Sequence, residues 1–523
     1  MTYGSLGVTD QRKVVVIGAG MGGLAAAIRL NAAGCAVTVI EMADGPGGKA
    51  RAVPSVAGPV DCGPTVLTLR HVADDLFALC GTRMEDEVDL ITLPRLARHF
   101  WPDGSTLDLF ADPEASYDAI RAFSSVREAE AFRRFDGLTR ALFQAFDAPL
   151  MRAAKPSLPR IAVTAAQRPA LWPALLPGLT LDGFLRRRFS DPRLVQLFGR
   201  YATYVGGRPS HSPAVLSLIW QAEAAGVWAV RQGMHGLAAA LARVAAARGV
   251  RFRYATKARR ILRQNNRVSG VELDQGSTLP CEICIFNGDP AALQDNLLGE
   301  APRDALPKGR MPPSLSAWVW AFAARPQGVD LAHHNVFFTA DPAQEFGPIG
   351  QGQMPLAPTL YVCAQDRELG QPPPAIERFE IIMNGPAGHP SFRSEDMACQ
   401  SRTFPMLRAQ GLTFSALPDR AALTTPALLA QSFPGSQGAI YGGSPEGGLA
   451  AFRRPLATTG LAGLYLAGGG THPGAGVPMA LLSGQHAATA AMAAPTSGSR
   501  SAPAAMRGGI STASRTTTRA PSR

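Results

Sequence analysis

The sequence has few charged residues, few cysteines and no long apolar run, and each shortage excludes a class of protein. Charged residues make up 17% of the 523 residues and apolar residues 46%, which is typical of a well-packed globular protein. The seven cysteines are odd in number and irregularly spaced, which excludes a disulfide framework and favours a reducing compartment. No uncharged apolar stretch reaches about 20 residues, so no segment is predicted to span a bilayer. Because no secretory signal precedes the first apolar run, we expect a cytoplasmic location.

Nucleic acid and metal ions are disfavoured as ligands by similar shortages. The formal net charge is +11, but the acid-free tail after Pro495 contributes several of the arginines. No basic patch is interleaved with aromatic residues, so no nucleic-acid partner is predicted. Cys281 and Cys284 form the closest cysteine pair, yet neither a second pair nor a nearby histidine completes a metal site. Residues 494–523, which are rich in Ser, Thr, Arg and Gly, cannot bury a core and are predicted to be disordered.

The glycine-rich segment after the first apolar run is the most informative part of the chain. A strand is predicted at 14–17, an alanine-rich helix at 22–33 and a second strand at 36–40, which ends at Glu41. The turn between the first strand and the helix has the form G-x-G-x-x-G, which brings backbone N–H groups to a pyrophosphate at a helix N-terminus. Glu41 lies near the spacing of the acid that binds a ribose hydroxyl. The order of these features predicts a dinucleotide cofactor, and the glycines just beyond Glu41 favour FAD over NAD.

A second glycine-rich loop occurs near the other end of the sequence. A short strand at 464–467 leads into a loop dense in glycine and alanine, and a helix is predicted from Met479 to about Met492. Backbone N–H groups at the start of that helix would again face an anion. In a flavoprotein this position suits the reduced isoalloxazine, which carries negative charge. The two loops together therefore predict FAD held from both ends of a single sheet.

These segments together resemble bacterial carotenoid desaturases, which are phytoene-desaturase-type flavoproteins of the amine oxidase superfamily. The resemblance extends from about Lys13 to Met492, and its most specific part is the run Thr-His-Pro-Gly-Ala-Gly-Val-Pro at 471–478. The segments 478–484 and 100–104 are similar to the hydroxyneurosporene desaturase branch. That branch comprises the 1-hydroxycarotenoid 3,4-desaturases, or methoxyneurosporene dehydrogenases, of spheroidene synthesis in purple photosynthetic bacteria.

The resemblance implies an oxidoreductase that acts on CH–CH groups, with FAD as cofactor and an acyclic, 1-hydroxylated carotenoid as substrate. A phytoene desaturase, an amine or protoporphyrinogen oxidase, and a non-catalytic lipid carrier are the alternatives. An acceptor such as oxygen or a quinone must reoxidise the flavin, and the sequence favours neither. The residues that the resemblance places against FAD are Gly18, Ala19, Gly20, Met21, Gly22, Gly23, Glu41, Gly48, Lys49, Arg51, Gly470, Pro473, Gly476, Val477 and Pro478, with Gly233, Met234 and Asp289 as weaker candidates.

The predicted fold class is α/β, with a Rossmann-like FAD-binding domain of the amine-oxidase type, a mixed-sheet substrate domain and a helical, membrane-associating insertion. The FAD-binding domain is expected to be discontinuous in sequence. Its segments are 12–75, 230–292 and 455–493, the helical domain is 105–229, and the substrate domain is 76–104 with 293–454.

The middle of the chain carries the predictions about catalysis and the membrane. Residues 118–146 have a helical apolar period, and 214–230 resembles a mostly buried helix in which Glu223 is the only charge. A buried carboxylate is rarely left unpaired, so Glu223 is either paired with an arginine or functional. As a functional residue it would accept the proton released in desaturation.

A segment rich in Trp, Leu, Phe and Arg at 170–189 suits either a helix inside the domain or a segment that enters lipid headgroups. Because a carotenoid is insoluble in water, we expect it to enter from a bilayer. This segment would then bind an anionic membrane surface, since basic residues there each add about 1 kcal/mol of attraction. The expected location is therefore peripheral, on the inner face of the cell or photosynthetic membrane.

Overall fold

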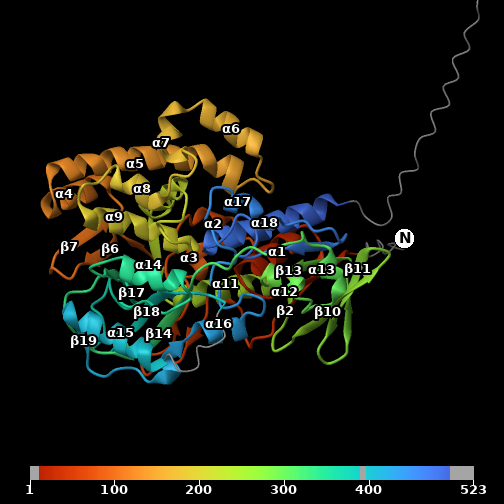
Figure 1. Ribbon diagram of the computed structural model, residues 1–523. Coiled ribbons are helices and arrows are strands. Elements are labelled where there is room, and N and C mark those ends of the chain that lie inside the picture. The colour runs from red at the N-terminus through yellow and green to blue at the C-terminus, as the bar shows by residue number, and fades with distance from the viewer. Residues whose placement is uncertain (1–10, 389–395, 495–523) are drawn as a thin grey trace, which may run out of the picture.

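The computed structural model describes residues 11–388 and 396–494, and a five-stranded sheet carries its N-terminal glycine-rich turn (Figure 1). Every neighbouring pair in this sheet is parallel. Parallel strands are buried on both faces, so they need continuous apolar runs such as 14–17. In spatial order the strands are β21 (Leu464–Leu466), β13 (Ile283–Phe286), β1 (Lys13–Ile17), β2 (Ala36–Ile40) and β9 (Arg251–Arg253).

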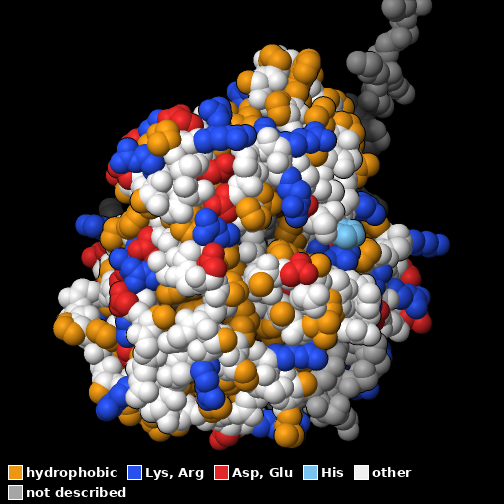
Figure 2. All heavy atoms as spheres, turned by 60° about the vertical axis from the view of Figure 1, so that its left-hand side comes forward, with side chains coloured by type: hydrophobic (Ala, Val, Ile, Leu, Met, Phe, Trp, Pro, Cys, Tyr) orange, Lys and Arg blue, Asp and Glu red, His pale blue; other side chains and the backbone are white. Residues whose placement is uncertain are grey.

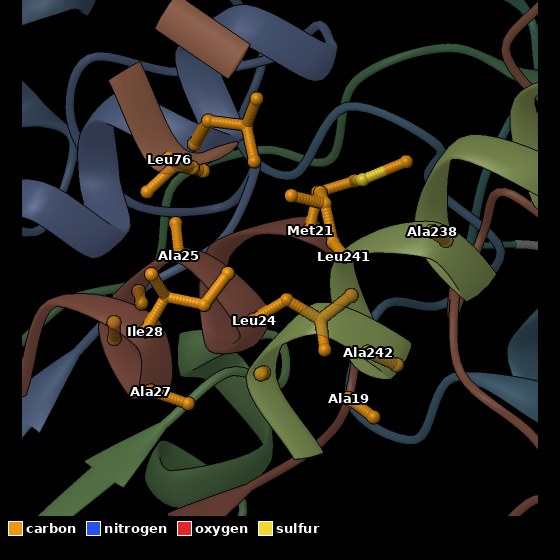
Figure 3. Close-up of a cluster of buried hydrophobic side chains, with 14 of the residues drawn as sticks. Ala19, Met21, Leu24, Ala25, Ala27, Ile28, Leu76, Ala238, Leu241 and Ala242 are labelled. Carbon is orange, nitrogen blue, oxygen red and sulfur yellow. The ribbon is translucent and has the colours of Figure 1, made fainter. Parts of the chain in front are cut away.

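Helices from three distant parts of the chain pack beside this sheet. Figure 3 shows Leu24, Leu76 and Leu241 of three different helices within one apolar cluster. The tightest helix pair depends on Gly484, because a Cβ there would lie 2.2 Å from the backbone oxygen of Gly22. The helices are α1 (Met21–Ala32), α2 (His71–Leu79), α3 (Met84–Glu87), α11 (Gly233–Ala247), α12 (Pro290–Gln294), α13 (Glu300–Asp304) and α18 (Val477–Ala493).

A small antiparallel sheet lies beside the parallel one. Its strands are β10 (Ala258–Gln264), β11 (Arg267–Leu273) and β12 (Thr278–Pro280). Cys281 is buried after β12 and Cys284 is buried in β13. Burial raises the pKa of Cys281 to about 12, so its thiol is protonated at neutral pH.

A seven-stranded sheet forms the second layer of the molecule, at the lower left of Figure 1. It is mixed, because β16 and β6 are parallel while its other neighbouring pairs are antiparallel. In spatial order the strands are β20 (Leu423–Thr424), β14 (Ser316–Ala324), β18 (Glu377–Gly385), β17 (Leu360–Ala364), β16 (His334–Phe337), β6 (Arg95–Phe100) and β7 (Thr106–Phe110). Together with the parallel sheet, this arrangement confirms the predicted α/β class with a second, mixed sheet.

Short elements complete this second layer. The two-stranded sheets pair β3 (Ala52–Val53) with β4 (Val60–Asp61) and β15 (Pro326–Gly328) with β19 (Leu412–Phe414). The helices of this part are α14 (Ala343–Gly350), α15 (Asp396–Ala409) and α16 (Pro426–Ser432), and the short helix α17 (Ala450–Arg453) follows them in the chain.

A layer of helices lies above the seven-stranded sheet in Figure 1. Its core is aromatic: the rings of Phe135 and Phe198 lie 4.7 Å apart, and Phe198 meets Trp220 edge-on at 5.6 Å. Its elements are β5 (Leu90–Leu93), α4 (Pro113–Phe123), α5 (Val126–Phe146), α6 (Leu158–Ala166), α7 (Trp172–Leu175), α8 (Leu181–Arg186), α9 (Pro192–Gly199), α10 (Trp220–Ala224) and β8 (Val227–Val230).

Two of the predicted helices are wrong in extent. The period at 118–146 belongs to two helices, because Ser125 caps a new helix by accepting a hydrogen bond from the backbone N–H of Glu128 at 3.2 Å. The predicted helix at 214–230 is a 3₁₀ segment, the short α10 and then the strand β8. Gly226, at φ +122°, turns the chain so that β8 pairs with β5.

The segment 170–189 divides into an exposed part and a buried part. Phe184, Leu185 and Phe189 are at most 2% exposed and belong to the aromatic core, so this part does not face lipid. Trp172, by contrast, is 53% exposed. In the described part of the chain no helix is both long and apolar enough to cross a membrane. The tail predicted to be disordered lies beyond the described residues except for residue 494.

Candidate active site

The first glycine-rich turn connects β1 to α1 at the carboxyl edge of the parallel sheet. Gly18 has a φ of +100°, and its N–H donates to the backbone oxygen of Ile40 at 2.8 Å. A Cβ on Gly20 would lie 2.8 Å from Nδ2 of Asn287, and one on Gly23 would lie 2.1 Å from the backbone oxygen of Gly18. Only glycines therefore permit this cradle, which fits a pyrophosphate held by backbone N–H groups. Among the described residues, no side chain caps the start of α1.

Glu41 lies directly beside this turn, at the end of β2. One carboxylate oxygen accepts a hydrogen bond from the N–H of Ala19 at 2.7 Å, and the other accepts from the N–H of Ala43 at 2.9 Å. The side chain is thereby fixed at the position that suits a ribose hydroxyl next to the pyrophosphate. The sequence spacing and the geometry of Glu41 agree.

The segment 47–51 joins the turn to the seven-stranded sheet. Gly48, at φ +58°, lies against Gly20, whose Cα would be 3.3 Å from a Cβ at residue 48. The Lys49 ammonium donates to the backbone oxygens of Ala439 and Ile440 at 3.1 and 2.7 Å. Burial lowers the pKa of Lys49 to about 8, although Asp289 opposes this shift.

Arg51 makes a second connection of the same kind. Its Nη2 donates to the hydroxyl of Thr424 in β20 at 2.7 Å. Lys49 and Arg51 therefore lie where the parallel and mixed sheets meet, as expected for residues between the phosphate and the flavin.

The second glycine-rich loop runs from β21 to α18 and packs on the first. A Cβ at Gly22 would lie 2.6 Å from the backbone nitrogen of Gly468. Gly470 approaches Gly442 equally closely, since a Cβ at Gly442 would lie 2.6 Å from the Cα of Gly470. Gly476, at φ +99°, precedes α18, which begins with Val477 and Pro478. Pro473 follows a cis peptide bond.

The turn, Glu41 and the second loop all follow carboxyl ends of parallel strands, and ligands of open α/β sheets bind outside such ends. The structure therefore brings the predicted cofactor residues to one edge of the sheet. The glycines there keep a space open that any larger residue at the same positions would fill. This geometry fits FAD. The contact of each residue with FAD stays a prediction.

Asn287, Asp61 and Arg454 also belong to this edge but were not predicted. Asn287 follows β13 and fills the space behind the first turn; its position after a buried strand was the available signal. Asp61 accepts hydrogen bonds from the N–H groups of Met234 and His235 at the start of α11. Burial raises the pKa of Asp61 to about 6, against the effect of these donors.

Arg454 holds the second loop in place through hydrogen bonds from its guanidinium group. Its Nη1 donates to the backbone oxygens of Tyr441 and Gly469 at 3.1 and 3.0 Å, and its Nη2 donates to that of Gly443 at 2.9 Å. Burial lowers the pKa of Arg454 to about 10. No sequence signal distinguishes this arginine from its neighbour at 453.

Two histidines and a cysteine form another group that the sequence did not indicate. His333, His334 and Cys363 are buried, and their donor atoms lie within 4.8 Å of one another. The Nδ1 atoms of the two histidines already bond to the backbone oxygen of Arg367 and the hydroxyl of Tyr361. The group thus belongs to the hydrogen-bonded interior of the mixed sheet.

Glu223 lies away from the glycine-rich loops, in the aromatic helical layer. Its carboxylate accepts a hydrogen bond from the hydroxyl of Tyr201 at 2.7 Å and lies 3.9 Å from Nη2 of Arg200. The side chain is 4% exposed. Of the two alternatives that the sequence allowed for Glu223, this is the pairing with an arginine. The role of Glu223 as a proton acceptor stays a prediction.

Comparisons with known proteins agree with this site. Residues 21–328 and 407–492 match the family described as flavin containing amine oxidoreductase. The chain belongs to this family, and its cofactor is FAD. It is 68% identical, over 92% of its length and 98% of the relative, to a protein named hydroxyneurosporene desaturase from Rhodobacter capsulatus.

More distant relatives have the same overall length and fold. The chain is 28% identical, over 90% of its length and 97% of the relative, to a 1-hydroxycarotenoid 3,4-desaturase from a Flavobacterium species. A crystal structure of an oxidoreductase from Methanosarcina mazei is 17% identical with a TM-score of 0.58, over 90% of this chain and 99% of that one. The predicted resemblance to carotenoid desaturases is therefore confirmed by sequence, and the fold by structure.

Proposed function

We propose that this chain is an FAD-dependent desaturase that introduces C=C bonds into an acyclic, 1-hydroxylated carotenoid such as 1-hydroxyneurosporene, as in spheroidene-type carotenoid biosynthesis. The observation that carries the proposal is the close packing of the two glycine-rich loops, with Gly22 against Gly468, at the edge where FAD fits. The 68% identical relative supports the reaction class. The name of the 28% identical relative supports a hydroxyl at C1 and oxidation between C3 and C4.

A cavity where the mixed sheet meets the helical layer has a size and lining that suit such a substrate. It has a volume of about 770 Å³ and lies between α9 and α14, within the range of small-molecule sites. Trp101, Phe338 and Phe346 give it apolar walls, and Arg200 and Gln196 add polar groups. An elongated apolar molecule with one polar end fits this combination.

Desaturation requires little chemistry from the side chains of the protein itself. FAD, when bound, accepts a hydride from the substrate. The walls of the cavity hold the chain in place and exclude water, and the conjugated polyene delocalises the positive charge that hydride loss creates. The remaining hydrogen leaves as a proton, for which a strong base is not required. Glu223 lies 3.9 Å from Nη2 of the cavity residue Arg200 and is the proposed acceptor.

The test is anaerobic mixing of the FAD-loaded protein with 1-hydroxyneurosporene in detergent. Flavin absorbance should bleach, and the product should have one more conjugated double bond, seen as a red-shifted spectrum and a mass lower by two hydrogens. A Gly23→Val variant should bind no FAD and leave the carotenoid unchanged. Bleaching by phytoene, an amine or protoporphyrinogen instead would favour an alternative enzyme. Carotenoid binding with no bleaching would indicate a carrier.

A peripheral position on the inner, cytoplasmic face of the cell or photosynthetic membrane is the second part of the proposal. No residue of the helix α6 is buried, although six of its nine residues are Leu, Ile, Val or Ala. Leu158 and Val163 of α6 are 49% and 55% exposed, and Trp172 and Leu176 nearby are 53% and 49% exposed. Figure 2 shows hydrophobic and basic side chains together at the top of the molecule, where α6 and α7 lie in Figure 1.

This exposed segment, 158–176, has the composition of an interfacial element. A helix with an unpartnered apolar side and adjacent basic residues binds anionic lipid headgroups. Arg160 and Arg168 are exposed beside the apolar residues. A carotenoid dissolved in the bilayer would then be delivered to the protein from this side.

A further inference from the structure

Two buried side chains beside the cavity have polar atoms that lack partners. Among the residues that the structure describes, Nε and Nη2 of Arg200 and Nε2 of His99 have no hydrogen-bond partner. Arg200 is 8% exposed and His99 is fully buried. An unpaired buried group costs about 1–3 kcal/mol, and a charged one costs more. Such atoms in a folded protein indicate an occupant that pairs with them.

Arg200 is held so that one edge of its guanidinium group stays available. Nη1 donates to the hydroxyl of Tyr204 at 2.7 Å, and the group lies 5.2 and 5.0 Å from the ring centres of Tyr201 and Tyr204. The nearest carboxylate oxygen, on Glu223, is 3.9 Å from Nη2, which is beyond hydrogen-bond distance. The N–H groups of Nε and Nη2 therefore form a donor edge with a counter-charge nearby but no acceptor.

His99 offers the complementary atom. Its Nδ1 lies 2.9 Å from the backbone oxygen of Leu107, which can only accept, so Nδ1 carries the hydrogen. Burial and, to a smaller extent, the charge of Arg200 lower the pKa of His99 to about 3. The ring is therefore neutral, and Nε2 is a hydrogen-bond acceptor.

We propose that Arg200 and His99 together bind the C1 hydroxyl group of the carotenoid, with Arg200 donating to the hydroxyl oxygen and the hydroxyl donating to Nε2 of His99. This inference rests on the proposed function. A hydroxyl is the group that donates and accepts at one atom. A carotenoid end without it would leave the donor edge and the imidazole nitrogen unpaired, and sites built to bind a hydroxyl reject such analogues strongly.

Arg200 lies at the cavity, and His99 lies behind two of the aromatic residues in its wall. Arg200 lines the cavity, and so do Trp101 and Phe338, whose rings lie 6.2 and 6.0 Å from that of His99.

On the other side, the hydroxyl of Tyr361 bonds to that of Thr65 at 2.7 Å. Thr65 follows Gly63, which touches the backbone of Lys49 so closely that a Cβ would lie 2.0 Å from its oxygen. Burial lowers the pKa of Arg200, but the groups around it raise it overall, in decreasing order Tyr204, Tyr201, Glu223 and Tyr361. Tyr361 therefore links the Arg200 side of the cavity to the segment beside Lys49.

Binding of two carotenoids that differ only in this hydroxyl tests the inference. FAD-loaded wild type, the His99→Phe variant and the double variant Arg200→Met/Glu223→Gln are titrated with 1-hydroxyneurosporene and neurosporene in detergent. The double variant removes the buried charge pair together, so that no charge is left unpaired. Thr203→Val is the matched control, because the Thr203 hydroxyl lies on the same wall but donates to the backbone oxygen of Arg200 at 2.8 Å.

Wild type and control should bind the hydroxylated carotenoid about 100-fold more tightly than neurosporene, or better. His99→Phe and the double variant should lower this ratio to near one by weakening only the hydroxylated carotenoid. A ratio near one in the wild type, or an unchanged ratio in both variants, overturns the inference. If one variant does not fold, the affinity ratio of the other variant still tests the inference.

Turnover in the same samples separates this inference from the proposed function. A wild type that prefers the hydroxylated carotenoid but desaturates neither would contradict the function and keep the binding site. A wild type that desaturates both carotenoids but binds them equally well would support the proposed function and contradict the binding site. The single Glu223→Gln variant should keep the binding preference, and a large loss of turnover with FAD still bound would support Glu223 as proton acceptor.

Discussion

Lys49 is the predicted FAD-binding residue whose charge is set near neutral pH. It is partly buried between the two sheets, where its ammonium donates to the backbone oxygens of Ala439 and Ile440 and lies 5.5 Å from the ring centre of Phe433. Burial lowers its pKa to about 8, so about half of the cofactor-free protein carries a neutral Lys49 at that pH. An anionic pyrophosphate nearby would favour the charged form and raise the pKa.

FAD affinity should therefore depend on pH in a defined direction. It should be constant below about pH 8, where Lys49 is already charged, and should fall up to tenfold per pH unit above it, because binding must then supply a proton. Fluorescence titration of the cofactor-free protein between about pH 6.5 and 9.5 measures this. Lys49→Met should bind FAD more weakly and with a flat profile over this range. A flat profile in the wild type would contradict a role of Lys49 near the phosphates.

At the residue scale, the sequence predicted those positions whose function depends on local backbone. Gly18, Gly20 and Gly23 are required by a turn of six residues. Glu41 is predicted by its sequence spacing from that turn, which a helix and a strand of ordinary length span. Asn287 and Arg454 could not be predicted in this way, because each acts on a glycine-rich loop through contacts that only the folded sheet creates.

The helix pair α1 and α18 couples the two glycine-rich loops, since each helix begins at one of them. Gly484 lets the two backbones touch: a Cβ there would lie 2.2 Å from the oxygen of Gly22 and 2.8 Å from Cβ of Ala25. Any side chain at 484 must push α18 away from α1 and with it the second loop from the first.

Gly484→Ala should therefore destabilise the protein by about 1–3 kcal/mol and weaken FAD binding. Gly137→Ala is the matched control, since Gly137 lies within the helix α5 with nothing within 4 Å of an added Cβ. Removing a helical glycine there should stabilise by about 0.5–1 kcal/mol. Urea unfolding with and without FAD measures both. Equal behaviour of the two variants would show that the helix contact is dispensable.

At the element scale, periodicity located helices better than it located their ends. The signal for the break before α5 was present as Ser125 followed by Glu128, a capping pattern, but the apolar period continued across it. At 227–230 the apolar run Val-Trp-Ala-Val suits a strand equally well, and only its partner β5 decides. That partner lies more than a hundred residues away in the sequence.

The whole molecule is held together across long sequence separations at the proposed site. Lys49 reaches Ala439, Arg51 reaches Thr424, and Asp61 bonds to Gln365. No local pattern specifies such pairs, so the sequence predicted the two glycine-rich loops but not the cavity between the sheet and the helical layer. The segment 170–189, which was predicted to bind a membrane, divides in the structure: its aromatic half at 184–189 is buried, and exposed apolar residues extend back to Leu158.

The proposed delivery of the substrate from a bilayer would depend on the whole molecule. The double variant Val163→Glu/Trp172→Glu places charges on the exposed segment 158–176, and Val56→Glu is a control at a residue 87% exposed in another loop. Wild type and control should float with anionic liposomes at low salt and detach as salt screens the basic residues.

The double variant should not float with these liposomes. Its turnover of 1-hydroxyneurosporene dissolved in them should fall at least about tenfold, because each buried apolar side chain contributes about 1.5–3 kcal/mol to binding. In detergent micelles its turnover should equal that of the wild type, since neither substituted residue lines the cavity. Equal loss in both media would assign these residues to folding or catalysis. No loss in either medium would move the route of entry to another face of the molecule.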